Sequence, residues 1–159
     1  MIRLAIVDDQ ALIRAGLARI LSPADGFDVV AEANDGAEGV LVASSESLDV
    51  VLMDIRMRGM DGIEATRAIR DADGPPVLIL TTFDDDETLA DALDAGAAGF
   101  ALKESPAEDL IRAVEVVAAG GSWIDPLVTP RVLASFRAAS PRTEGGADVE
   151  ELTERENEV

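Results

Sequence analysis

The sequence predicts an α/β fold, a doubly wound parallel sheet of five strands with helices on both faces. Two observations predict it: five compact apolar runs alternate with stretches of helical period, and no internal repeat breaks the alternation. Right-handed crossovers satisfy such an alternation by placing the strands side by side under helices on both faces. With 159 residues, 48% of them apolar, the chain is long enough to build this core.

The apolar runs are the expected strands. They span residues 4–7, 29–33, 50–53, 77–80 and 99–102. Most are flanked by Gly, Pro or Asp, as expected of strands buried on both faces.

Amphipathic stretches between the runs predict helices. Their apolar positions recur at helical spacing: Ile13, Leu17, Ile20 and Leu21; Leu89 and Leu93; Leu110, Val114 and Val117. Before the last stretch, Ser105 is expected as the N-cap, Pro106 as the first helical residue and Glu108 as the capping-box partner. Gly120 marks the end of that helix.

The chain divides into three parts. Residues 1–121 form the α/β domain, residues 122–147 a linker with a short helix, and residues 148–159 an acidic stretch with too few apolar side chains to fold alone. Within the linker, 122–126 is expected to be a connector. The helix is expected to start at Thr129 rather than Asp125, because Pro130 would oppose a helix that began earlier.

The charge balance excludes several classes of function. The chain has 32 Asp and Glu against 13 Lys and Arg, a formal net charge of −19, whereas binding to nucleic acid or to an anionic membrane requires clustered cations.

The chain has no cysteine and no histidine, which excludes disulfides, the usual zinc sites and phosphotransfer to histidine. With no targeting segment and no apolar run near the ~18 residues of a membrane helix, we expect a cytoplasmic protein without a membrane span.

Polar residues follow four of the predicted strands. They are Asp8 and Asp9 after the first strand, Asp54 after the third, Thr81 after the fourth and Lys103 after the fifth. Ligand sites of open parallel sheets form outside the carboxyl ends of the strands. We therefore expect these side chains at one edge of the sheet.

Three carboxylates at one edge would repel each other unless a cation joined them. Because only oxygen ligands are at hand, Mg²⁺ or Mn²⁺ is the expected ion. Beside it, Asp54 could attack phosphorus and form an acyl phosphate, with Thr81 and Lys103 binding the phosphoryl oxygens. Each part also has an ordinary interpretation: an Asp-Asp pair after a strand is commonly a turn or helix cap, and a single lysine can fall at a strand end by chance.

The motifs occur in the order of a known family. They are VDDQ at 7–10, MDIRM at 53–57, LTTFDDD at 80–86, AGAAGF at 95–100 and LKE at 102–104. In these segments the chain resembles the receiver domain of bacterial two-component response regulators of the NarL/FixJ subfamily. The resemblance covers residues 1 to about 121 and the linker helix, and residues 152–159 look like the opening of a LuxR-type helix-turn-helix domain.

The resemblance implies a flavodoxin-like sheet with strand order 2-1-3-4-5 and a role for each site residue. Asp54 would be the phosphoacceptor; Asp8, Asp9, Asp54 and the backbone carbonyl of Arg56 would hold Mg²⁺; Lys103 would contact the phosphoryl group; Thr81, rather than Thr82, would be the switch hydroxyl and Phe100 the switch aromatic. Core filling is nearly as good an interpretation of Phe100.

The resemblance also implies partners. They are a sensor histidine kinase as phosphoryl donor, a second copy of the chain on activation, and DNA through a C-terminal output domain missing from this chain. The protein would be a transcription regulator and not an enzyme. We expect a truncated form of a longer regulator, since residue 159 falls where the helix of that domain would continue.

Two departures from the subfamily affect the site. Arg58 stands where the subfamily usually has proline, so the loop after Asp54 lacks a fixed φ. Arg56 and Phe83 occupy positions that could shield the acyl phosphate from water, and we hypothesise that they lengthen its lifetime.

Two other functions remain open from the sequence. A metal-dependent phosphohydrolase would also form an aspartyl phosphate, but it would normally carry its nucleophile and acid/base carboxylates together after the first strand. A pseudo-receiver acting only as a docking module is less favoured, because the acidic set is intact.

Overall fold

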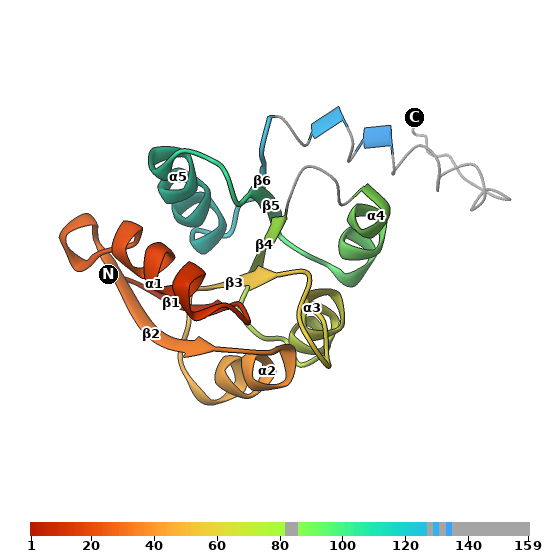
Figure 1. Ribbon diagram of the computed structural model, residues 1–159, viewed down its shortest axis with the longest axis horizontal. Helices are drawn as coiled ribbons and strands as arrows, with labels where there is room; N and C mark the ends of the chain where they lie inside the picture. The colour runs from red at the N-terminus through yellow and green to blue at the C-terminus, as the bar shows by residue number, and fades with distance from the viewer. Residues whose placement is uncertain (82–85, 127–128, 131–132, 135–159) are drawn as a thin grey trace, which may run out of the picture.

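Strands and helices alternate along the chain as predicted (Figure 1). The computed structural model describes residues 1–81, 86–126, 129–130 and 133–134. The strands are β1 (Ile2–Val7), β2 (Phe27–Ala33), β3 (Val50–Asp54), β4 (Val77–Thr81), β5 (Gly99–Leu102) and β6 (Trp123–Ile124). The helices are α1 (Ala11–Ile20), α2 (Gly36–Ser45), α3 (Gly62–Asp71), α4 (Asp86–Ala95) and α5 (Ala107–Ala118), with a 3-10 turn at Pro23–Asp25.

All strand pairs are parallel, and the order across the sheet is β2-β1-β3-β4-β5-β6. The predicted order 2-1-3-4-5 is therefore confirmed. The chain runs outward from β1 to β2 and then back past β1 to β3, so right-handed crossovers place α1 on one face and α2, α3 and α4 on the other (Figure 1). The reversal of direction next to β1 is the place where sheets of this kind bind their ligands.

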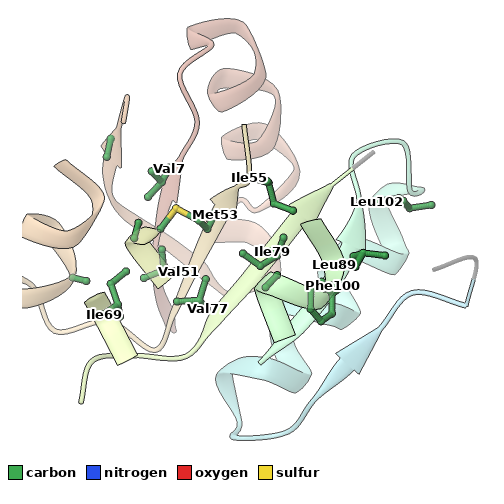
Figure 2. Packing of buried hydrophobic residues seen from close by; sticks show 14 residues of the cluster. Val7, Val51, Met53, Ile55, Ile69, Val77, Ile79, Leu89, Phe100 and Leu102 are labelled. Carbon is green, nitrogen blue, oxygen red and sulfur yellow. The ribbon is translucent and has the colours of Figure 1, made fainter. Parts of the chain in front are cut away.

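Each face of the sheet has its own apolar core. Val51 and Met53 of β3 face the side covered by α2, α3 and α4, and Figure 2 shows them in one layer with Ile79 and Phe100. Leu52 of the same strand faces the opposite side, under α1 and α5. Because β3 and β4 are buried along their whole length, any polar group at their ends is held in a rigid frame.

The sixth strand was not predicted. The segment expected as a connector contains β6, which pairs with β5 through bonds from Trp123 N to Ala98 O (3.4 Å) and from Asp125 N to Phe100 O (2.9 Å). These bonds satisfy part of the otherwise open edge of β5. Since α5 lies on the face of α1 although β6 lies beyond β5, this crossover is left-handed, which is rare and cannot be inferred from the alternation.

The predicted cap of α5 is wrong. The helix begins at Ala107, Pro106 holds the N-cap position, and the Ser105 side chain makes no capping bond. Ser105 Oγ instead donates to Asp125 Oδ2 at 2.7 Å, because β6 brings a buried carboxylate within its reach. The predicted end is confirmed: Gly120, with φ 95°, and Gly121 close the helix by donating to Val117 O and Val116 O.

Several predictions lie outside the described residues. They concern Thr82 and Phe83, the linker beyond residue 126 apart from residues 129–130 and 133–134, and residues 148–159. None of the described helices has the length and apolarity needed to cross a bilayer.

Candidate functional site

Parallel pairing brings the carboxyl ends of β1, β3, β4 and β5 to the same edge of the sheet. Asp8 and Asp9 follow β1, Asp54 is the last residue of β3, Thr81 is the last residue of β4, and Lys103 follows β5 directly. The structure thus brings these five predicted site residues to one edge.

Asp8, Asp9 and Asp54 form a carboxylate cluster. One oxygen from each lies within 4.8 Å of the others, with Asp8 and Asp54 buried and Asp9 exposed. A cation would stabilise this cluster, because burial of Asp8 and Asp54 removes the water that would otherwise screen their charges.

Lys103 supplies part of that compensation. Its Nζ lies 2.9 Å from Asp54 Oδ1 and 3.6 Å from Asp8 Oδ2, and its backbone N donates to Thr81 O at 2.9 Å. Burial lowers the pKa of Lys103, but the hydrogen bond and charge of Asp54 and the charge of Asp8 outweigh burial and hold this pKa above its ordinary value. Lys103 therefore remains a cation facing two carboxylates.

Asp54 has a raised pKa. Burial is the main cause; the hydrogen bond and charge of Lys103 lower the pKa, and the neighbouring charges of Asp8 and Asp9 raise it further, leaving it above the ordinary value of 3.8. Lys103 therefore does not fully offset the burial of Asp54 and the charges of Asp8 and Asp9. A divalent cation would do so, because it favours the charged form of all three carboxylates.

Asp8 presents one oxygen to the cluster and has its other polar groups bound elsewhere. Its backbone N donates to Ala33 O (3.1 Å), its Oδ1 accepts from Gln10 N (2.9 Å), and its backbone carbonyl accepts from Arg14 Nη1 (2.6 Å). Its Oδ2 is buried and has no hydrogen-bond partner among the described residues. A buried carboxylate oxygen of this kind fits a hard cation such as Mg²⁺.

Thr81 and Phe100 occupy different positions relative to the cluster. Thr81 is buried at the end of β4, on the same edge as Asp54. Phe100 is buried in β5 inside the apolar core and packs in one cluster with Leu89 of α4 (Figure 2). Thr81 and Phe100 are connected through the pairing of β4 with β5, in which Ile79 is the partner of Phe100 and Leu102 the partner of Thr81.

The loop after Asp54 carries two exposed arginines, Arg56 and Arg58. Arg58 borders a cavity of about 460 Å³ together with Asp9, Gln10, Asn34 and Asp35. The residue that replaces the usual proline therefore stands beside the acidic cluster.

Arg14 was missed by the sequence analysis. It is the fourth residue of α1, and its side chain reaches back to the end of β1. The sequence carried one weak signal: a cation near a helix N-terminus opposes the helix dipole at a cost of about 0.3–1 kcal/mol. The partner itself could not be read from the sequence, since it is a backbone carbonyl.

Residues 4–115 match the response regulator receiver domain family. Since this match covers most of the chain, the chain belongs to that family. It is the class of phosphoacceptor domain that the doubly wound sheet and its acidic edge also indicate.

The proteins most similar in sequence to this chain include transcriptional regulators. The transcriptional regulatory protein LiaR of Bacillus subtilis (strain 168) is 39% identical over 160 residues, which cover 100% of this chain and 74% of LiaR. The nitrate/nitrite response regulator NarL of Escherichia coli (strain K12) is 34% identical over 155 residues, which cover 97% of this chain and 71% of NarL.

Solved structures agree with the fold. The response regulator ChrA of a heme-sensing two-component system superposes with a TM-score of 0.70 at 39% identity, over 98% of this chain and 71% of ChrA. The receiver domain of a putative NarL from Mycobacterium tuberculosis gives 0.71 at 38% identity, over 75% of this chain and 97% of that domain.

Proposed function

We infer that this receiver domain is switched by phosphorylation of Asp54, with a sensor histidine kinase as the donor. One observation carries the proposal: Asp54 is a buried strand-end carboxylate within 4.8 Å of two further carboxylates, and its Oδ1 lies 2.9 Å from the Lys103 ammonium. The Asp54 carboxylate is therefore shielded from water and oriented by its strand. The neighbouring ammonium can neutralise negative charge that develops beside it.

The transfer can be written with the residues of this chain. A carboxylate oxygen of Asp54 attacks the phosphorus of a phosphohistidine, and the new P–O bond forms as the P–N bond breaks. The electron pair of that bond leaves with the imidazole, which takes up a proton. Lys103 moves from pairing the carboxylate to pairing the phosphoryl oxygens, and the Thr81 hydroxyl donates a hydrogen bond to one of them.

Mg²⁺, or Mn²⁺, would be held by Asp8, Asp9, Asp54 and the backbone carbonyl of Arg56. The ion would neutralise the charge that accumulates on the phosphoryl oxygens. Asp8 would contribute through Oδ2, the buried oxygen that has no hydrogen-bond partner within the described part of the chain.

The output we propose is a shift between two populations of the domain. Phosphorylation adds about −1.5 to −2 charges and three acceptor oxygens, and Thr81 and Lys103 turn toward them. The packing around Phe100 and α4 then changes, and the domain favours a second copy of itself. Dimerisation would in turn control a DNA-binding domain of the kind found in transcription regulators, and the chain itself would not be an enzyme.

The test is labelling of the purified chain by acetyl phosphate with and without Mg²⁺. Mass spectrometry locates the modified residue and size-exclusion chromatography follows the oligomeric state. We expect one Mg²⁺-dependent phosphoryl group on Asp54, a shift toward the dimer, and no label in Asp54→Asn. Equal labelling of Asp54→Asn would contradict the assignment, multiple turnover of a generic phosphate ester would indicate a phosphohydrolase, and the absence of label would indicate a pseudo-receiver.

A further inference from the structure

Arg14 connects three elements beside the carboxylate cluster. Its Nη1 donates to the backbone carbonyl of Asp8 at 2.6 Å, and its Nε donates to Glu32 Oε1 at 3.1 Å. The side chain is only 17% exposed, whereas that of Glu32 is 44% exposed. One guanidinium thus ties α1 to the end of β1 and to β2.

These bonds leave Asp8 little freedom. Its backbone N donates to Ala33 O and its Oδ1 accepts from Gln10 N. The bond from Arg14 fixes the remaining backbone group, the carbonyl. Rotation of the peptide that follows Asp8 would break the Arg14 bond and displace Gln10 N, whose bond orients the carboxylate. Oδ2, which faces Lys103 Nζ at 3.6 Å, would then lose its fixed position.

Helix stability does not explain an arginine at this position. It lies near the N-terminus of α1, where the helix dipole disfavours a cation. The ordering of a long side chain also costs conformational entropy. The carbonyl of Asp8 and the carboxylate of Glu32 offset both costs, and both bonds serve the end of β1 and its neighbour β2.

We propose that Arg14, anchored by Glu32, is a positioning residue for the divalent cation site. It holds the backbone of Asp8 so that Oδ2 stays directed at the cation. This rests on the proposed function, because it assumes that Asp8, Asp9 and Asp54 bind Mg²⁺.

Positioning and simple electrostatics predict opposite signs. Arg14→Met removes a positive charge near the cluster, so charge alone would make the site more negative and tighten Mg²⁺ binding. Loss of a group that orients a ligand weakens metal binding by about 10- to 100-fold. The direction of the change in Kd therefore separates the two roles.

The matched control is Arg3→Met. Arg3 has the same kind of contacts at the opposite end of β1: its Nε donates to Ser47 O at 2.7 Å and its Nη1 lies 3.7 Å from Asp28 of β2. The substitution Arg3→Met therefore removes the same charge and the same type of bond to a backbone carbonyl, but at the end of β1 that lies away from the carboxylate cluster.

The experiment is calorimetric titration of the full chain with MgCl₂, for wild type, Arg14→Met, Arg14→Lys, Glu32→Gln and Arg3→Met. We expect a Kd about 10- to 100-fold higher in Arg14→Met, a smaller rise in Glu32→Gln, partial rescue by Arg14→Lys and no change in Arg3→Met. Lysine restores a donor for the Asp8 carbonyl but cannot serve Glu32 at the same time.

The other outcomes overturn the proposal in distinguishable ways. Unchanged or tighter binding in Arg14→Met reduces Arg14 to a structural or electrostatic residue. Arg14→Met could fail to fold, in which case Glu32→Gln decides. This variant changes an exposed residue and keeps the arginine but removes its anchor, so an unchanged Kd for Mg²⁺ would overturn the proposal. Failure of the wild type to bind Mg²⁺ would instead refute the cation site of the proposed function, and the role of Arg14 with it.

Discussion

At the residue scale, opposing interactions act on the pKa of Asp54. Burial and the charges of Asp8 and Asp9 disfavour its carboxylate, while Lys103 at 2.9 Å favours it, and the resulting pKa is raised. The folded state thus holds Asp54 in a charged form that is more costly than in the unfolded chain. In the proposed function Asp54 needs this charged form as a nucleophile, so stability would be given up at the position of the proposed chemistry.

The raised pKa of Asp54 predicts a pH dependence of stability in metal-free buffer. Between the ordinary value of 3.8 and the raised folded value, the folded state binds more protons at Asp54 than the unfolded state does. This residue therefore lowers the free energy of unfolding as the pH rises through that window. Asp54→Asn removes the contribution, so the variant should gain stability relative to wild type as the pH rises. Urea unfolding at several pH values measures the difference, and a difference that is constant with pH would contradict the prediction.

The exposed side chain of Arg56 follows Asp54 by two residues. We hypothesise that its side chain, and that of Phe83, keep water from the acyl phosphate, so Arg56→Asn should shorten the lifetime of phosphorylated Asp54. A tenfold shorter lifetime corresponds to a barrier about 1.4 kcal/mol lower. The decay of the labelled chain is followed after removal of phosphodonor. Arg67→Asn, which removes an exposed arginine of α3 paired with Asp94, should decay like wild type, and equal decay of all three would refute the hypothesis.

At the scale of elements, α3 begins directly against the end of β3, the strand whose last residue is Asp54. A capping box joins Asp61 and Glu64 at its N-terminus, and Gly62 N donates to Ile55 O at 2.9 Å. A Cβ on Gly62 would overlap the backbone carbonyl of Asp54. The absence of a side chain at Gly62 thus allows the helix to start against the end of β3.

Gly62→Ala should therefore destabilise the fold by about 1–3 kcal/mol, the usual cost of forcing extra atoms into a packed site. Gly16→Ala in α1 is the control, because outside the helix's own backbone no described residue lies within 4 Å of the added Cβ, and alanine favours a helix over glycine by about 1 kcal/mol. Urea denaturation should show opposite changes in the midpoint for the two variants. Similar losses in both would show that the close approach to Asp54 is not the cause.

At the scale of the whole molecule, the site exists only in the folded sheet. Asp8 and Asp54 are 46 positions apart in the sequence and meet because β1 pairs with β3. The unfolded chain offers no such cluster, so an ion that binds there binds the folded state alone. Folding and cation binding are therefore linked.

This linkage predicts that Mg²⁺ stabilises the chain. At a concentration 100 times its Kd, the free energy of unfolding should rise by about 2.7 kcal/mol. Asp8→Asn should lose most of this gain, because it weakens the oxygen ligand at Oδ2, whereas Asp28→Asn at the opposite end of the sheet should keep it. Thermal unfolding with MgCl₂ or with EDTA measures both, and an equal gain in the two variants would place the ion elsewhere.

The sequence predicted most of the framework, and its failures were local. Apolar runs marked β3 and β4 because both strands are buried on both faces and show no polar alternation. The pairing of β6 and the contact between Ser105 and Asp125 were missed, since both depend on groups about twenty residues apart that meet only after α5 has folded back.

The sequence by itself determined which residues end the strands, because hydrophobic burial selects the runs and the polar groups stop them. It also determined that these polar groups share one edge, since parallel strands align their carboxyl ends. Only the tertiary structure decided that Asp8 keeps one oxygen without a hydrogen-bond partner among the described residues and that Arg14 holds its backbone. Hydrogen bonds to backbone carbonyls depend on the relative placement of elements at the ångström scale, and no side-chain pattern encodes that placement.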